Sequence, residues 1–116
     1  MDERLVKAQE FANYRVTLQR KQEVLKLKMQ NALQFSSDGG TFRITPELIS
    51  FAKLQMDEGL DSTILLDTNE NPIFIINLKK FYEDIYSKYF EAMNDYQREY
   101  AKLRKARRVA SIVDMD

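Results

Sequence analysis

The stretch that sets the architecture is LKKFYEDIYSKYFEAMNDYQREYAKLRKARRVASIV, residues 78–113. It contains neither Gly nor Pro, and apolar, aromatic or small side chains recur along it at spacings of three and four residues. We therefore expect one long helix, with Asn77 as its N-cap and residues 114–116 as a frayed tail. Glu99 is the only charged member of its apolar seam, which consists of Leu78, Tyr82, Ile85, Tyr89, Ala92, Tyr96, Glu99, Leu103, Ala106, Ala110 and Val113.

A second long helix is predicted over residues 1–35, where Gly and Pro are again absent and good helix formers predominate. Its seam is narrower than that of the last helix, because Arg15 and Gln22 interrupt it. The run Ser36-Ser37-Asp38-Gly39-Gly40 ends the helix, since paired glycines favour a turn. The seam consists of Ala8, Phe11, Arg15, Leu18, Gln22, Leu25, Met29 and Ala32.

Residues 36–76 predict a small β-α-β-β head between the two long helices. Thr45 offers a hydroxyl N-cap followed by Pro at the first helical position, and Gly59 is placed to end that helix. A polar loop of hairpin length separates the last two β-prone runs. The predicted elements are the strand Thr41–Ile44, the helix Pro46–Glu58 and the strands Ser62–Leu66 and Pro72–Ile76.

The predicted fold class is therefore α+β and mainly helical, and residues 1–116 form a single domain. The two long helices either pair as an antiparallel coiled-coil hairpin within one chain or splay apart and pair with other chains. The sequence leaves both arrangements open.

Cys and His are both absent. Disulfides, thiolate and imidazole metal ligands and the commonest general base are therefore excluded, and catalysis would rest on carboxylates, Lys or Tyr. The loop Asp67-Thr68-Asn69-Glu70-Asn71 lacks the Gly and the final Glu of an EF-hand loop, so it predicts a hairpin tip. We predict that the chain is not an enzyme and takes no cofactor, metal or small-molecule substrate. A small enzyme that uses carboxylates and tyrosine is an alternative.

The aromatic side chains of the last helix predict an oligomer interface, because five of the six tyrosines lie there. They cover more than one seam, and one neighbouring helix covers only a narrow stripe. Packing under the head within the same chain is the alternative. The predicted interface consists of Phe81, Tyr82, Ile85, Tyr86, Tyr89, Phe90, Met93, Tyr96, Tyr100 and Leu103.

Charge is unevenly placed, although the formal net charge is zero. Residues 1–35 carry seven Lys/Arg against four Asp/Glu, residues 36–76 two against seven, and residues 77–116 nine against seven. A basic patch near the C-terminus could bind phosphates, although cations there also favour the helix dipole. The patch consists of Lys102, Arg104, Lys105, Arg107 and Arg108, and the cations Arg15, Arg20, Lys21, Lys26 and Lys28 of the first helix would extend it.

Three stretches carry a resemblance to a known group of proteins: residues 10–15 (EFANYR), residues 49–51 (ISF) before Gly59, and residues 103–109 (LRKARRV). They resemble small proteins of large contractile-tailed bacteriophages, including prohead-core and scaffold components. The resemblance implies a viral assembly protein, but it transfers no catalytic or ligand-binding residue.

These observations predict a non-enzymatic assembly protein that forms a homo-oligomer through its long helices, with other viral structural proteins as a second class of partner. A nucleic-acid-binding accessory factor that uses the basic patch is the alternative function. The charged start, Met1-Asp2-Glu3-Arg4, predicts no signal peptide, and the longest apolar run, Ile73–Ile76, is too short to cross a membrane. We expect no membrane partner and a cytoplasmic location, in the host cytoplasm or the virion if the protein is viral.

Overall fold

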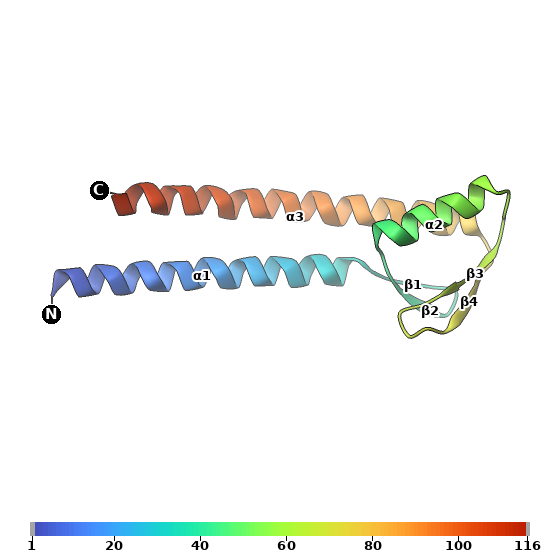
Figure 1. Ribbon diagram of the computed structural model, residues 1–116, viewed down its shortest axis with the longest axis horizontal. Helices are drawn as coiled ribbons and strands as arrows, with labels where there is room; N and C mark the ends of the chain where they lie inside the picture. The colour runs from blue at the N-terminus through green and yellow to red at the C-terminus, as the bar shows by residue number, and fades with distance from the viewer. Residues whose placement is uncertain (1, 116) are drawn as a thin grey trace. The chain divides into compact units, whose positions relative to one another are not determined.

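The computed structural model describes the backbone of residues 2–115 and the side chains of residues 2–105. It confirms the predicted α+β class, with two long terminal helices and small two-stranded sheets between them (Figure 1). Contacts divide the chain into two compact units: a head unit, Met29–Asn94, and a helical unit, Met1–Lys28 with Asp95–Asp116. The elements are α1 (Glu3–Ala32), β1 (Gln34–Ser37), β2 (Gly40–Arg43), α2 (Pro46–Asp57), β3 (Thr63–Leu66), β4 (Pro72–Ile75) and α3 (Leu78–Met115).

In the helical unit, α1 and α3 run antiparallel and side by side (Figure 1). Leu18 is the one buried side chain among those described in this unit. The helices therefore pair within one chain here, along the two predicted seams, but with a small core. The half-buried seam positions are Phe11, Gln22 and Leu25 on α1, and Tyr96, Glu99 and Leu103 on α3.

The head unit begins with a hairpin of which the sequence predicted only the second strand, as Thr41–Ile44. The first helix ends at Ala32, not at residue 35, and β1 pairs with β2 in antiparallel register. Asp38 and Gly39 form the turn with φ of 53° and 84°, and a two-residue hairpin turn of the primed type needs positive φ at both positions. The run predicted only as a helix stop is therefore a hairpin, because Asp-Gly fits this turn better than a helix C-cap.

The second hairpin, β3–β4, is fixed by the carboxylate of Asp67. That carboxylate accepts hydrogen bonds from the N–H groups of Asn69 and Asn71, both at 2.9 Å, and of Thr41 at 3.3 Å. The N–H of Thr68 also donates to the carbonyl of Thr41 at 2.8 Å. These bonds attach the loop of β3–β4 to β2, so the two hairpins, which are separate two-stranded sheets, are held next to each other.

The helix starts follow the predicted caps. The N–H of Leu48 donates to the Thr45 hydroxyl at 3.1 Å, and the N–H of Lys80 donates to the side-chain oxygen of Asn77 at 3.1 Å. Gly59, with φ of 89°, follows the end of α2 as predicted. The backbone of α3 continues to Met115, two residues past the predicted end.

The core of the head unit lies between α2, the two hairpins and the start of α3. The ring of Phe81 meets that of Phe42 edge to face at 5.2 Å and that of Phe35 at 5.9 Å. All five predicted seam positions of α3 in this unit are buried or half-buried, as the periodicity of the sequence predicts. The most fully buried large side chains are Phe42, Ile44, Ile75, Leu78 and Ile85.

Candidate interaction surfaces

The first turns of α3 place part of the predicted interface inside the chain's own core. Phe81 and Ile85 are 2% and 0% exposed, so the core accounts for them and they are not available to a partner. Half-buried members of the interface pack against that core, namely Tyr82, Tyr89 and Met93. The alternative of packing under the head therefore applies to these five residues.

Tyr86 and Phe90 remain on the surface of the same helix, 45% and 46% exposed. Their ring centroids lie 4.7 Å apart, and Tyr86 also lies 5.8 Å from Tyr82. Phe90 meets the ring of Tyr89 edge to face at 5.9 Å. The two exposed rings, called the aromatic pair below, are thus held by half-buried neighbours that are anchored in the core.

Three members of the predicted interface lie in the helical unit. Tyr96 and Leu103 are half-buried along the seam with α1, where they pack within the chain. Tyr100 is 37% exposed and stacks on Tyr96 with their ring centroids 6.1 Å apart. Of the ten predicted interface residues, the structure leaves three well exposed: Tyr86, Phe90 and Tyr100.

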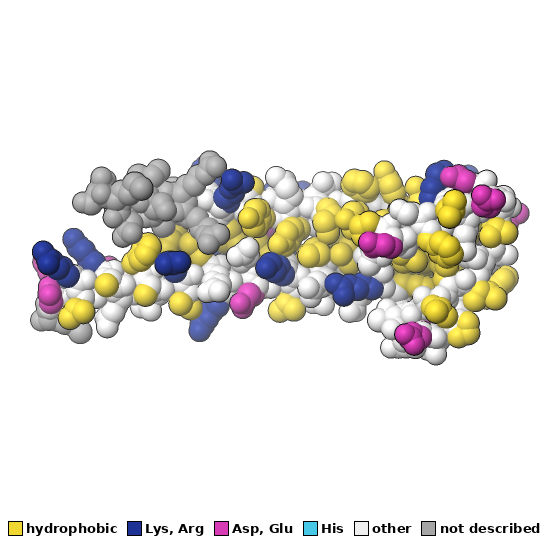
Figure 2. Space-filling model, in the orientation of Figure 1, with side chains coloured by type: hydrophobic (Ala, Val, Ile, Leu, Met, Phe, Trp, Pro, Cys, Tyr) yellow, Lys and Arg dark blue, Asp and Glu magenta, His cyan; other side chains and the backbone are white. Residues whose placement is uncertain are grey.

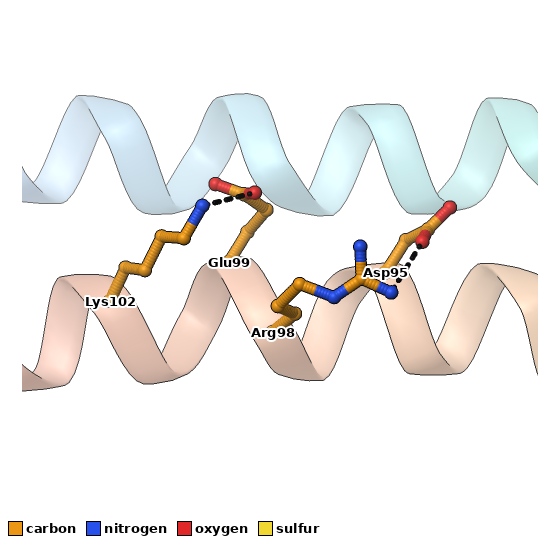
Figure 3. Close-up of polar contacts among 4 residues, drawn as sticks. All are labelled: Asp95, Arg98, Glu99 and Lys102. Carbon is orange, nitrogen blue, oxygen red and sulfur yellow. Dashed lines mark hydrogen bonds and ion pairs between the residues drawn. The ribbon is translucent and has the colours of Figure 1, made fainter.

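The described part of the basic patch is exposed, namely Lys102, Arg104 and Lys105, whereas the side chains of Arg107 and Arg108 lie outside the described residues. Figure 3 shows Glu99 and Asp95 reaching from α3 toward the ribbon of α1, each bound to a cation of α3 itself. The atoms of these pairs are 3.1 Å apart for Lys102–Glu99 and 3.4 Å apart for Arg98–Asp95. Over residues 2–105 every ion pair lies within one helix, so none links α1 to α3.

A groove between α1 and α3 in the helical unit brings together cations from both helices. Arg20 and Lys21 of α1 join Lys102 of α3 at its rim, with Glu99 as its one acidic member. The sequence predicted that cations of α1 would extend the basic patch, and the structure places these two beside it. This basic groove is lined by Thr17, Arg20, Lys21, Val24, Leu25, Glu99, Lys102 and Leu103.

One surface was missed by sequence reasoning, namely the side of the β3–β4 hairpin that faces away from the core. Ile64 of β3 lies directly opposite Phe74 of β4, and Leu66 lies opposite Pro72. The side chains of Ile64, Leu66, Phe74 and Ile76 are 63%, 64%, 56% and 69% exposed. Both strands are apolar at nearly every position instead of alternating, which was the available signal for a sheet with two apolar faces.

Exposed acidic residues lie at both ends of this hairpin. Asp61 is exposed just before β3, and its carbonyl accepts a hydrogen bond from the N–H of Leu78 at 2.9 Å, which places it beside the hairpin's base. Glu70 is exposed in the loop at the hairpin tip. Figure 2 shows hydrophobic side chains of the head reaching the surface with acidic ones among them.

Features that would indicate a catalytic or metal centre are weak. Within residues 2–105 no group of three or more Asp and Glu side chains is placed to hold a metal ion. The pKa of Asp67 is lowered, chiefly by the hydrogen bond from the N–H of Asn71, but this carboxylate fixes the β3–β4 loop. Among the described residues, no helix is long and apolar enough to cross a membrane.

Comparison with known proteins gives no match: no family model, no curated protein and no solved structure resembles this chain. The suggested resemblance to small proteins of large contractile-tailed bacteriophages, prohead-core and scaffold components among them, therefore stays a prediction.

Proposed function

We propose that this chain is a non-enzymatic assembly protein, of viral origin, that self-associates with α3 as its main contact. The observation that carries the proposal is the aromatic pair: Tyr86 and Phe90 stay about half exposed although the core beneath them is complete. The resemblance of the sequence to phage assembly proteins supports the same role. The absence of Cys and His supports a role without catalysis.

The aromatic pair suits a protein interface for two physical reasons. Its rings are held by contacts with Tyr82 and Tyr89, so little side-chain freedom remains to be lost on binding. Aromatic side chains also bury large apolar areas, and Tyr is among the residues that most often dominate binding energy.

Sedimentation velocity over a concentration series at micromolar chain tests this proposal. We expect wild-type protein to associate reversibly, and the double variant Tyr86→Gln, Phe90→Gln to weaken association at least about tenfold, since each change removes a buried ring from the interface. Ser87→Gln with Glu91→Gln is the matched control, because both residues are exposed on α3 and neither belongs to the predicted interface. Equal association by wild type and the aromatic variant would show that α3 is not the main contact.

A second function is favoured by the basic groove, where Arg20 and Lys21 of α1 lie beside Lys102 of α3. Neither α1 cation forms an ion pair with another residue of the described part of the chain. Two helices thus offer one cationic rim, as a nucleic-acid-binding accessory factor requires.

Fluorescence anisotropy with labelled single-stranded and double-stranded DNA tests this second function. Counterion release predicts binding that weakens steeply with salt and falls further on Arg104→Ala with Lys105→Ala. Lys53→Ala, on α2, is the control cation. Absence of binding at low salt would exclude the function.

A further inference from the structure

The β3–β4 hairpin is apolar on both faces, and only one face is used within the chain. Leu65 and Ile75 point into the head core at 4% and 0% exposure, whereas their neighbours Ile64, Phe74 and Ile76 are more than half exposed. An apolar face of this kind, rimmed by polar residues, is typical of a protein contact. We therefore expect a partner to bury the outer face of the hairpin.

The charges around the hairpin indicate which kind of partner buries it. Residues 36–76 carry seven acids against two cations, and the exposed residues Asp61 and Glu70 lie at the two ends of the hairpin. A complementary partner has an apolar floor with cations at its rim. The same chain carries such a surface: the basic groove has Val24, Leu25 and Leu103 in its lining. Its charged residues are Arg20, Lys21 and Lys102 with one acid, Glu99, which pairs with Lys102 and leaves Arg20 and Lys21 as the cations that a partner would meet.

We infer that the outer face of the β3–β4 hairpin of one copy docks in the basic groove of a second copy. The inference rests on the proposed self-association and adds a second contact to it. The apolar residues of the hairpin cover the aliphatic lining of the groove, and Asp61 and Glu70 meet Arg20 and Lys21.

Two other occupants fit less well. Packing of two outer faces on one another would bring Asp61 and Glu70 of both copies together, and like charges at an interface are costly. A nucleic acid would use the cations but not the aliphatic lining, since bases stack on aromatic rings and none lines the groove.

The contact joins two different surfaces of the chain. Two copies close it as a dimer when each hairpin enters the other copy's groove, and when only one hairpin is used the free groove and free hairpin extend it into a ring or a filament. Association through this contact should also weaken with salt, because its charged rim is exposed.

Charge reversal tests the contact, using full-length protein and sedimentation velocity. The head variant is Asp61→Lys with Glu70→Lys, and the groove variant is Arg20→Glu with Lys21→Glu; all four residues are exposed, and circular dichroism and thermal unfolding check that each variant folds. We expect either variant alone to associate at least about tenfold more weakly than wild type, because each then opposes like charges. An equimolar mixture of the two variants should regain association, since each copy again meets a complementary surface.

The outcomes separate this inference from the proposed function. If wild type associates and both charge variants associate equally well, the hairpin–groove contact is overturned while self-association stands. If wild type is monomeric throughout, the proposed function fails first. If the groove variant assembles normally but loses binding to a labelled oligonucleotide, the groove is a nucleic-acid site and the inference is overturned.

Discussion

Gly40 allows the two hairpins of the head to pack closely, because it has no side chain. A Cβ at this position would lie 2.5 Å from Cγ1 and 2.9 Å from Cδ1 of Ile73, on the opposite hairpin. Ile73 is β-branched, so it cannot rotate away without leaving its preferred rotamer. Gly40 is therefore required by packing and not by turn geometry. The turn itself is formed by Asp38 and Gly39, which have positive φ.

Gly40→Ala should destabilise the protein by about 1–3 kcal/mol, because the added methyl overpacks the contact with Ile73. Urea unfolding followed by circular dichroism measures the change. Gly39→Asn is the control, since its Cβ meets open space and Asn tolerates positive φ. A Gly40→Ala midpoint equal to that of wild type would contradict the packing described here.

Asp67 should make stability depend on pH. The N–H of Asn71, and then those of Thr41 and Asn69, hold the pKa of this carboxyl below its ordinary value, although burial opposes them. A pKa that is lower in the folded state stabilises the fold above the unfolded pKa, and this stability is lost as pH falls through the folded value.

Asp67→Ala should therefore lower stability at neutral pH and reduce the loss of stability between neutral pH and about pH 3. Urea titrations at both pH values, with Asp61→Ala as an exposed carboxylate control, provide the measurement. Equal pH dependence in wild type and Asp67→Ala would show that the loop does not depend on this carboxylate.

The helices, the second hairpin and the second strand of the first hairpin were largely predictable, whereas the first strand, β1, was not. The caps at Thr45 and Asn77 and both seams follow from local signals that a single sequence contains. The strand β1 reads QFSS and has little strand propensity of its own, so only pairing with β2 makes it a strand. The Asp-Gly turn was its one signal, and it resembled a helix stop.

Loss of either N-cap should destabilise the helix that it begins, which is α2 for Thr45 and α3 for Asn77. Thr45→Ala and Asn77→Ala should each cost about 1 kcal/mol, because each leaves a first-turn N–H without its side-chain acceptor. Asn77→Asp should be nearly neutral, since Asp also caps well. Thermal unfolding of the three variants decides this, and a neutral Asn77→Ala would show that the cap contributes nothing.

The candidate surfaces were only partly predictable, because the sequence does not show which elements pack against one another. Periodicity finds the apolar faces of α3, but it does not say which neighbours cover them. Phe81 and Ile85 are therefore in the core, while Tyr86 and Phe90 on the same helix are exposed. The outer face of β3–β4 was missed because a run of apolar residues predicts a strand without saying whether both faces are covered.

The two units of the molecule differ in how much apolar surface they bury. The head unit has a continuous core of ten buried residues, whereas Leu18 is the one buried side chain described in the helical unit. No ion pair of the described residues links α1 to α3. The helical unit should therefore open more readily than the head.

Hydrogen exchange should show this difference directly. In dilute protein we expect the amides of residues 7–28 to exchange faster than those of β2 and of residues 82–94, because fewer apolar contacts must break to expose them. Their protection should rise with protein concentration if the groove is covered by a second copy. Uniform protection in both units would contradict the small core of the helical unit.

Self-association is tested most directly by the sedimentation coefficient of the wild-type chain over a concentration series. We predict a coefficient that rises with concentration and a rise that largely disappears when Tyr86 and Phe90 are replaced by Gln. A coefficient that corresponds to a single chain of 13.7 kDa at every concentration would contradict the proposed assembly role.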